Sequence, residues 1–482
     1  MQGYEYLTCE ADFLDYSFTR VVISYRHSNF KNIKGTYIML KIIFSNILVT
    51  MVILGFQSAA MAAAGRGKPP AYFVDKSELP FTALPGASAL WGVHTGAGYR
   101  VEVPDNWNGD LVVWAHGFRG TGLELTVDNH PLRALLIAQG YAWAASSYSR
   151  NDYDISTGVQ DTHALVKRFN GLVGNPDKVY LTGVSMGGHI TAVSIEQYPN
   201  TYDGALPACG AIGDYALFDY FLDFNVAAQQ IATGNSTYPI DAAVYIGQTV
   251  PQIKTNLEAF PGAWPFVLNA DGLDLKSLTE LRSGGKRPNF DEAFAFWNSI
   301  PSTTGNGNFL FELAIGDGTL PRAPGVGVDN IGVVYQFDTD PLLTSDEQAL
   351  NDGIVRIEAD PQGKGPDGLS QVPVISGDIT IPVLTLHNLG DLFVPVLNEV
   401  EYASRVAGHG KSDLLVQRAI RGVVHCDFTA AEFSSAFIDL VTWVETGVKP
   451  AGDDWLTPST VADPSFGCKF TDGEHVLGTS CP

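Results

Sequence analysis

The sequence predicts an α/β protein with a mostly parallel central sheet, helices on both faces of that sheet, and a large helical insertion. Three observations indicate this fold class. Short apolar runs alternate with helical patterns over residues 90–210. The alternation stops over residues 213–376, where amphipathic and aromatic helical stretches are separated by loops rich in Gly, Pro and Asn. It then resumes over residues 381–450.

The first part of the expected core contains five strands. Several are continuous apolar runs, which are typical of strands buried on both faces. The expected strands are Gly98–Val103, Leu111–Ala115, Tyr141–Ser146, Val179–Thr182 and one that opens at Gly204–Pro207. The helices expected between them are Leu132–Gln139, Val159–Val173 and Gly187–Tyr198, the last stopped by Pro199.

The insertion and the second part of the core follow. Helical spacing within the insertion is clearest over Asp214–Ala232 and Asp291–Asn298. The insertion is also rich in aromatic side chains, which either bind aryl or medium-chain acyl groups or, as we prefer, form its own core. These side chains are Tyr215, Phe218, Tyr220, Phe221, Phe224, Phe260, Phe266, Phe294 and Phe296. The resumed core is expected to contain strands Ile381–His387 and Leu414–Ile420 and helices near Leu397–Ala407 and at Thr429–Thr446.

A secretory signal is predicted near the N-terminus. Met39-Leu40-Lys41 precedes the apolar run Ile42–Phe56, and small residues of the A-x-A type follow, so we expect cleavage after Ala62 or Ala64. An uncleaved anchor is the alternative. We therefore expect residues 1–38 to precede the true start of translation. The expected organisation is signal 39–64, core 65–212, cap 213–376, core 377–450 and tail 451–482, in a secreted or periplasmic protein without stable membrane insertion.

The chain is strongly acidic, with 29 Lys and Arg against 52 Asp and Glu and a net charge of -23. Such a surface repels phosphate backbones, so we expect no nucleic-acid partner. The sequence has no HExxH zinc motif, no Cys/His cluster with zinc spacing and no EF-hand loop. Gly410-Lys411-Ser412 is not a P-loop, because Arg405 occupies the position of the required first glycine. We expect neither a metal nor a cofactor.

Four cysteines follow the predicted signal, and Cys9 precedes it. An even number in an exported chain indicates two disulfides, with three possible pairings. We favour Cys468–Cys481, which would link two positions within the tail, together with Cys209–Cys426.

The pentapeptide Gly183-Val184-Ser185-Met186-Gly187 predicts a nucleophile. The pattern alone is weak, but here it follows an expected strand and opens an expected helix, which is the context of a nucleophile elbow. Gly183 and Gly187 allow strand and helix to pass closely. An ordinary serine in a strand-to-helix turn is the alternative.

A serine hydroxyl needs a base, and the base needs an orienting carboxylate. His425 follows the last expected strand and Asp391 follows the strand before it. Rival carboxylates are weaker: Glu399 and Glu401 fall within a helix, Asp427 is too near His425 in sequence, and Asp378 precedes its strand. His387 also ends a strand and is a candidate to line the pocket, whereas His163, His189 and His409 are assigned to helices or a turn.

An oxyanion site needs two N–H donors. We assign them to Met186, the residue after the nucleophile, and to Phe118 in the loop His116-Gly117-Phe118 that follows the strand Leu111–Ala115. A simple strand-ending turn is the alternative for this loop.

Together, the GVSMGG elbow, the HGF loop, Gly390-Asp391 before Val394-Pro395 and the late His425 resemble the α/β-hydrolase serine esterases. The resemblance covers roughly Leu90–Cys209 and Ile381–Pro450, and the motifs AWAASSY, YDGALPACG and the final His-Cys are similar to secreted bacterial esterases and amidases with a large cap. It implies an α/β-hydrolase fold, an acyl-enzyme and no cofactor. In the strand numbering of that fold, the cap is expected between strands 6 and 7. Tannase-like feruloyl esterases have a cysteine before the serine, where this chain has Val184, so that family is not indicated.

We therefore expect a serine hydrolase acting on small-molecule or oligomeric carboxylic esters, with the oligomeric state left open. An amidase or peptidase with the same triad is the first alternative. A non-catalytic binding module with a hydrolase fold is the second, and an interfacial lipase would require a cap that opens.

Overall fold

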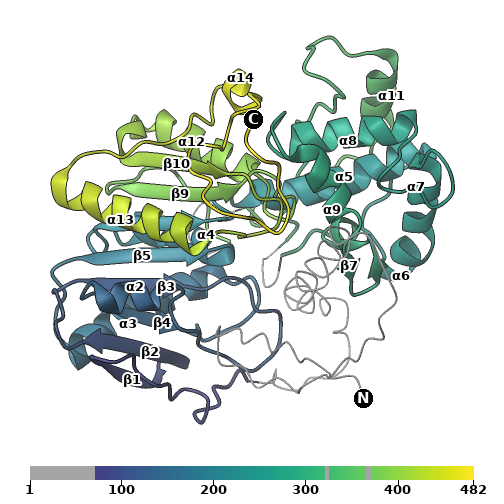
Figure 1. Cartoon of the computed structure of the whole chain (residues 1–482). Coiled ribbons are helices and arrows are strands. Elements are labelled where there is room, and N and C mark those ends of the chain that lie inside the picture. Colours follow the sequence, from purple (N-terminus) through teal and green to yellow (C-terminus); the bar gives the residue numbers. More distant parts are fainter. Residues whose placement is uncertain (1–70, 321–324, 365–371) are drawn as a thin grey trace, which may run out of the picture. The chain divides into compact units, whose positions relative to one another are not determined.

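We describe the protein from a computed structural model, which covers residues 71–320, 325–364 and 372–482 (Figure 1). The expected signal at 39–64, the residues before it and Cys9 lie outside the described residues. None of the described helices is long and apolar enough to cross a membrane.

An eight-stranded sheet forms the centre, in the order β1-β2-β4-β3-β5-β6-β9-β10. β2 runs antiparallel to both β1 and β4, and the other neighbours are parallel. The strands are β1 (Ala87–His94), β2 (Ala97–Pro104), β3 (Leu111–Ala115), β4 (Ala142–Ser146), β5 (Val179–Val184), β6 (Gly204–Ala208), β9 (Val383–Asn388) and β10 (Leu415–Ile420). We did not predict β1, an edge strand whose residues are partly buried or exposed and which therefore lacks a continuous apolar run.

Helices cover both faces of the sheet. α3 (Ile155–Leu172), α4 (Met186–Gln197) and α12 (Leu397–Gly408) pack in one core cluster, which includes Leu111 and Val113 of β3. α2 (Arg133–Ala138) and α13 (Ala430–Thr446) pack in the other, with Val112 and Trp114. Successive side chains of a strand point to opposite faces, which explains why one apolar run serves both cores. This mostly parallel sheet, covered on both faces, has the α/β-hydrolase fold that the sequence predicts.

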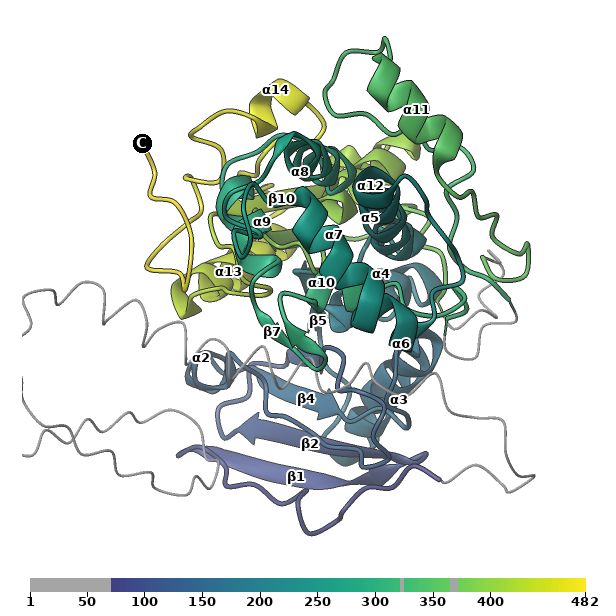
Figure 2. The ribbon, with the colours of Figure 1, turned by 90° about the vertical axis from the view of Figure 1, so that its right-hand side faces the viewer.

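A cap connects β6 to β9, the sixth and seventh strands of the sheet, and lies beyond the ends of the strands rather than over a face (teal and green in Figure 1; nearest the viewer in Figure 2). It contains α5 (Tyr215–Thr233), α6 (Ala242–Val244), the π-helical turn η1 (Tyr245–Thr249), α7 (Val250–Leu257), α8 (Ala270–Arg282), α9 (Phe290–Trp297), the short strands β7 (Pro301–Ser302) and β8 (Gly305–Asn306), α10 (Phe309–Glu312) and α11 (Ser345–Gly353).

Most of the cap's aromatic side chains form the cap's own core, as we preferred from the sequence. Tyr220, Phe224 and Phe294 are among its largest fully buried members. Phe260 and Phe266 differ, because they are 57% and 69% exposed.

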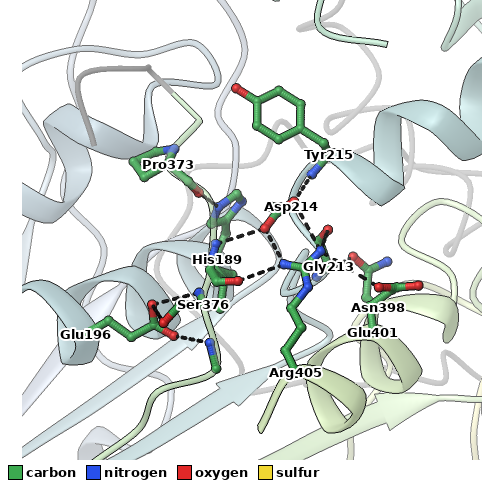
Figure 3. A network of polar contacts seen from close by, with 12 residues as sticks. His189, Glu196, Gly213, Asp214, Tyr215, Pro373, Ser376, Asn398, Glu401 and Arg405 are labelled. Carbon is green, nitrogen blue, oxygen red and sulfur yellow. Dashed lines mark hydrogen bonds and ion pairs between the residues drawn. The ribbon is translucent and has the colours of Figure 1, made fainter. Parts of the chain in front are cut away.

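The two junctions of the cap lie side by side and are tied to the core by one polar network (Figure 3). Asp214, at the start of α5, accepts hydrogen bonds from Arg405 of α12 and, at 2.9 Å, from the backbone N–H of Ile375. Glu196 of α4 accepts bonds of 2.8 Å from both the N–H and the hydroxyl of Ser376. The first and last segments of the cap are therefore attached to the helices beneath them.

The tail contains the short helix α14 (Pro458–Val461) and packs on the core near Leu389 and Ala419. The short 3-10 helix η2 (Ser412–Leu414) precedes β10. Both favoured disulfides are present: Cys468–Cys481 closes a loop within the tail, and Cys209–Cys426 joins the end of β6 to the loop after β10.

Candidate active site

Ser185 lies in the sharp turn between β5 and α4, as the N-cap residue of α4. Its backbone φ of 56° is in the left-handed region, which residues other than glycine seldom adopt. The neighbouring backbones pass very closely here. A Cβ atom at Gly187 would lie 2.0 Å from the carbonyl oxygen of Ala115, and one at Gly183 would lie 2.2 Å from that of Gly187. Glycine at these positions is what permits the turn.

The structure brings Ser185, His425 and Asp391 together from three separate strand ends. His425 Nε2 lies 2.8 Å from Ser185 Oγ, and His425 Nδ1 lies 2.5 Å from Asp391 Oδ2. Asp391 is fully buried, and its Oδ1 accepts hydrogen bonds of 2.9 and 3.0 Å from the N–H groups of Phe393 and Val394. Both oxygens of the carboxylate are therefore held, and one of them faces the imidazole.

The loop after β3 lies beside Ser185. A Cβ atom at Gly117 would be 3.2 Å from Ser185 Cβ and 3.7 Å from Oγ. Met186 is the first residue of α4, and helix N-termini carry N–H groups that lack intrahelical acceptors. Of the two residues assigned as oxyanion donors, Met186 directly follows Ser185, and Phe118 directly follows Gly117, which lies beside Ser185.

His116 of the same loop is a buried structural residue. Its Nδ1 lies 2.7 Å from the carbonyl oxygen of Gly117, and its ring stacks on Tyr148 at 4.0 Å. Burial, with the nearby charge of Arg119, lowers the pKa of His116 well below its usual range. The neutral form of this histidine is therefore favoured, and its ring contacts Gly117 and Tyr148.

The surroundings of His425 restrict its movement. Phe393 packs edge-on against the imidazole at 5.1 Å. Cys426 follows directly and is bonded to Cys209, so the loop that carries His425 is covalently joined to the end of β6. Cys209, His425 and Cys426 bring three potential metal ligands within 4.8 Å of one another, but both sulfur atoms are in the disulfide and cannot act as thiolate ligands.

The rival carboxylates are engaged elsewhere. Glu399 is buried, accepts hydrogen bonds of 2.6 Å from Thr385 and 2.5 Å from Gln417, and lies 3.1 Å from His387 Nδ1. Asp427 accepts a 2.9 Å hydrogen bond from the N–H of Val476 in the tail. Glu401 and Asp378 are exposed side chains beside Arg405 and Lys411.

His387 does not line a pocket, contrary to one expectation. It is fully buried, and its Nε2 donates a 2.7 Å hydrogen bond to the carbonyl oxygen of Val394. Burial opposes its protonation, but the hydrogen bond and charge of Glu399 outweigh burial and raise the pKa of His387. Its Nδ1 and the carboxylate of Glu399 form a hydrogen-bonded pair inside the protein. His189, next to the elbow, is also buried, and burial lowers its pKa to about 4.

The sequence did not identify the cap residues that contact the loops carrying Asp391 and His425, the two candidate triad loops. Arg287, Asn289 and Trp297 are all buried and donate hydrogen bonds to backbone carbonyls after β9 and β10. Only the aromatic character of α9 distinguishes this stretch in the sequence, since the contacts join residues about 90 to 130 positions apart.

No protein-family model matches the chain. The o-phthalyl amidase of Xanthobacter agilis is 23% identical over 403 residues, covering 74% of this chain and 87% of that protein. Among solved structures, an esterase from Aspergillus oryzae is similar with a TM-score of 0.41 and 16% identity, over 76% of this chain and 80% of that one. Feruloyl esterase B from Aspergillus oryzae has a TM-score of 0.44 and 16% identity, over 76% and 81%. A relative over most of both lengths that is named an amidase supports hydrolase activity.

Proposed function

We propose that this protein is a secreted serine hydrolase that cleaves carboxylic esters through an acyl-enzyme. One observation carries the proposal: the continuous contact from Ser185 Oγ to His425 Nε2 and from His425 Nδ1 to Asp391 Oδ2. Ser185 attacks the acyl carbonyl while His425 accepts its proton, and Asp391 holds the imidazole tautomer and stabilises the imidazolium. The N–H groups of Met186 and Phe118 bind the oxyanion, and the imidazolium of His425 gives its proton to the departing alcohol, which leaves the acyl-enzyme. Neutral His425 then takes a proton from a water molecule, which attacks the acyl group and releases the acid and the free Ser185 hydroxyl.

The two disulfides support an exported location, because such bonds persist in oxidising compartments. N-terminal sequencing of the exported protein should find a start after Ala62 or Ala64. A start at Met1 in exported protein would exclude the proposed cleavage.

The first experiment is labelling of the mature protein with a fluorophosphonate probe, followed by peptide mapping. We expect an adduct on Ser185, and we expect Ser185→Ala to remain unlabelled and to lose on the order of 10⁶ in turnover. A folded protein that takes up no label would refute the mechanism and favour the non-catalytic binding module.

Amide hydrolysis is the second candidate, and the relative named o-phthalyl amidase favours it specifically. Matched p-nitrophenyl esters and p-nitroanilides of one acyl group distinguish the two. For each acyl group, the ratio of kcat/KM on the ester to kcat/KM on the anilide is divided by the ratio of their rates of hydrolysis by hydroxide. A corrected ratio above one across the acyl groups supports the esterase. An anilide preference on that corrected scale supports the amidase.

A further inference from the structure

Trp297, the last residue of α9 in the cap, contacts both triad loops through a single atom. Its Nε1 donates to the carbonyl oxygen of Gly390 at 2.9 Å and to that of Val423 at 3.1 Å. Gly390 directly precedes Asp391, and Val423 lies two residues before His425. The indole is 1% exposed, so no solvent competes for these bonds.

The two loops already touch at this point. The N–H of Gly390 donates to the carbonyl oxygen of Gly422 at 2.9 Å, and a Cβ atom at Gly390 would lie 2.8 Å from Val423 Cα. The indole N–H of Trp297 adds a donor that the carbonyl groups of Gly390 and Val423 share. Because it bonds both, a change in the separation of the loops weakens at least one of these bonds.

Neighbouring cap residues hold the same loops separately. Arg287 Nε donates to the carbonyl oxygen of Leu389 at 2.7 Å, and Asn289 Nδ2 donates to that of Arg421 at 3.0 Å. Each of these side chains anchors one loop, whereas Trp297 joins the two.

We propose that Trp297 is a positioning residue that sets the distance between the loops carrying Asp391 and His425 through its shared indole N–H. This inference rests on the proposed function, since it assigns a role in aligning that triad. It also makes the cap part of the catalytic scaffold rather than only a cover. Alignment of catalytic groups within a fraction of an ångström has large effects on rate.

The test is Trp297→Phe, which keeps an aromatic ring and removes the N–H. The matched control is Trp264→Phe. Trp264 also lies in the cap's aromatic cluster, 6.0 Å from Phe294, but its buried Nε1 has no hydrogen-bond partner among the described residues. Ring contraction is common to both variants, whereas loss of a shared hydrogen bond occurs only in Trp297→Phe.

We expect Trp297→Phe to lower kcat about tenfold with KM nearly unchanged, because the loss acts on alignment rather than on substrate binding. The low-field proton resonance of His425 Nδ1–H should also move in Trp297→Phe and stay in place in Trp264→Phe. Equal kcat losses in both variants, or an unchanged resonance in Trp297→Phe, would overturn the proposal.

If Trp297→Phe does not fold, Trp297 can be replaced by benzothienylalanine, which keeps both rings and has sulfur in place of the N–H. The kcat and the His425 Nδ1–H resonance are then measured on that variant. Failure of the proposed function is recognised separately. In that case the wild-type protein is unlabelled at Ser185 and inactive, whereas the resonance still reports whether Trp297 positions the Asp391–His425 pair.

Discussion

Two buried carboxylates near the end of β9 each face an imidazole, and their partners give them different roles. Asp391 faces His425, which in turn reaches Ser185. Glu399 faces His387, whose other nitrogen is bonded to a backbone carbonyl. The first pair reaches the hydroxyl of Ser185 and the second ends inside the protein, so only the first has the arrangement that the proposed proton transfer to a substrate requires.

Substitution of each carboxylate by its amide distinguishes the role of Asp391 from that of Glu399. Asp391→Asn should lower kcat by about 10⁴-fold, because the amide no longer stabilises the required tautomer and the imidazolium. Glu399→Gln should leave kcat close to the wild-type value and lower the free energy of unfolding by about 1–3 kcal/mol, since buried hydrogen bonds are weakened. Steady-state kinetics and urea unfolding of both variants check this. The assignment of Asp391 is wrong if Glu399→Gln shows the larger loss of kcat.

At the scale of elements, the position of Ser185 depends on how closely α4 approaches the neighbouring strands. Gly188, in the first turn of α4, faces the backbone after β6: a Cβ atom there would lie 2.5 Å from Gly210 Cα. A contact with backbone cannot be relieved by rotating a side chain. The glycines after Ser185 are therefore required by packing between elements as well as by the turn itself.

We predict that Gly188→Ala lowers the free energy of unfolding by about 1–3 kcal/mol through overpacking. The control is Gly171→Ala near the end of α3, where a Cβ atom meets nothing within 4 Å and φ is not in the left-handed region. That variant should be stabilised by about 0.5–1 kcal/mol, because alanine loses less conformational entropy in a helix. Urea unfolding measures both. Equal stability of Gly188→Ala and wild type would contradict the close approach of α4.

At the scale of the whole molecule, the loop that carries His425 is held by the cap on one side and by the tail on the other. Trp297 contributes from the cap, and the N–H of Val423 donates to the carbonyl oxygen of Leu477 in the tail at 3.0 Å. His475 of the tail is nearly buried, with Nδ1 2.8 Å from the carbonyl oxygen of Asp427 and Nε2 3.0 Å from Glu432. Because both ring nitrogens face acceptors, the doubly protonated imidazolium fits this position.

This contact predicts a pH-dependent stability. Burial opposes protonation, but the hydrogen bonds to Asp427 and Glu432 outweigh it and raise the pKa of His475 to about 10. A histidine in the unfolded chain titrates near pH 6.5. The stabilisation from His475 is therefore fully present below about pH 6.5 and is lost as the pH rises through about 10.

We expect the wild type to exceed His475→Gln in free energy of unfolding by on the order of 2 kcal/mol at pH 6, with the difference shrinking towards pH 10. Comparison of the two proteins removes the effect of other titrating groups. A difference that stays constant over this range would show that the imidazolium is not the stabilising species.

Much of the fold could be predicted from the sequence because strands, turns and helix ends depend on short stretches of chain. The apolar run of β3 was located to the residue, and the elbow around Ser185 was recognised from five positions and their context. β1 was missed, since an edge strand has no continuous apolar run to reveal it. The order of Ser185, Asp391 and His425 along the chain was also sufficient to name candidates, because the ends of parallel strands meet at one edge.

By itself, then, the sequence determined the parallel core and the candidate nucleophile, which follow from local pattern and chain order. It indicated two disulfides but left three possible pairings, among which the structure decided. Only the tertiary structure decided that Glu399 is paired with His387, that Trp297 bridges the loops carrying Asp391 and His425, and that His475 of the tail contacts Asp427 and Glu432. The physical reason is that these contacts join side chains to partners on other elements. Their geometry depends on how cap, core and tail pack together, which no local pattern encodes.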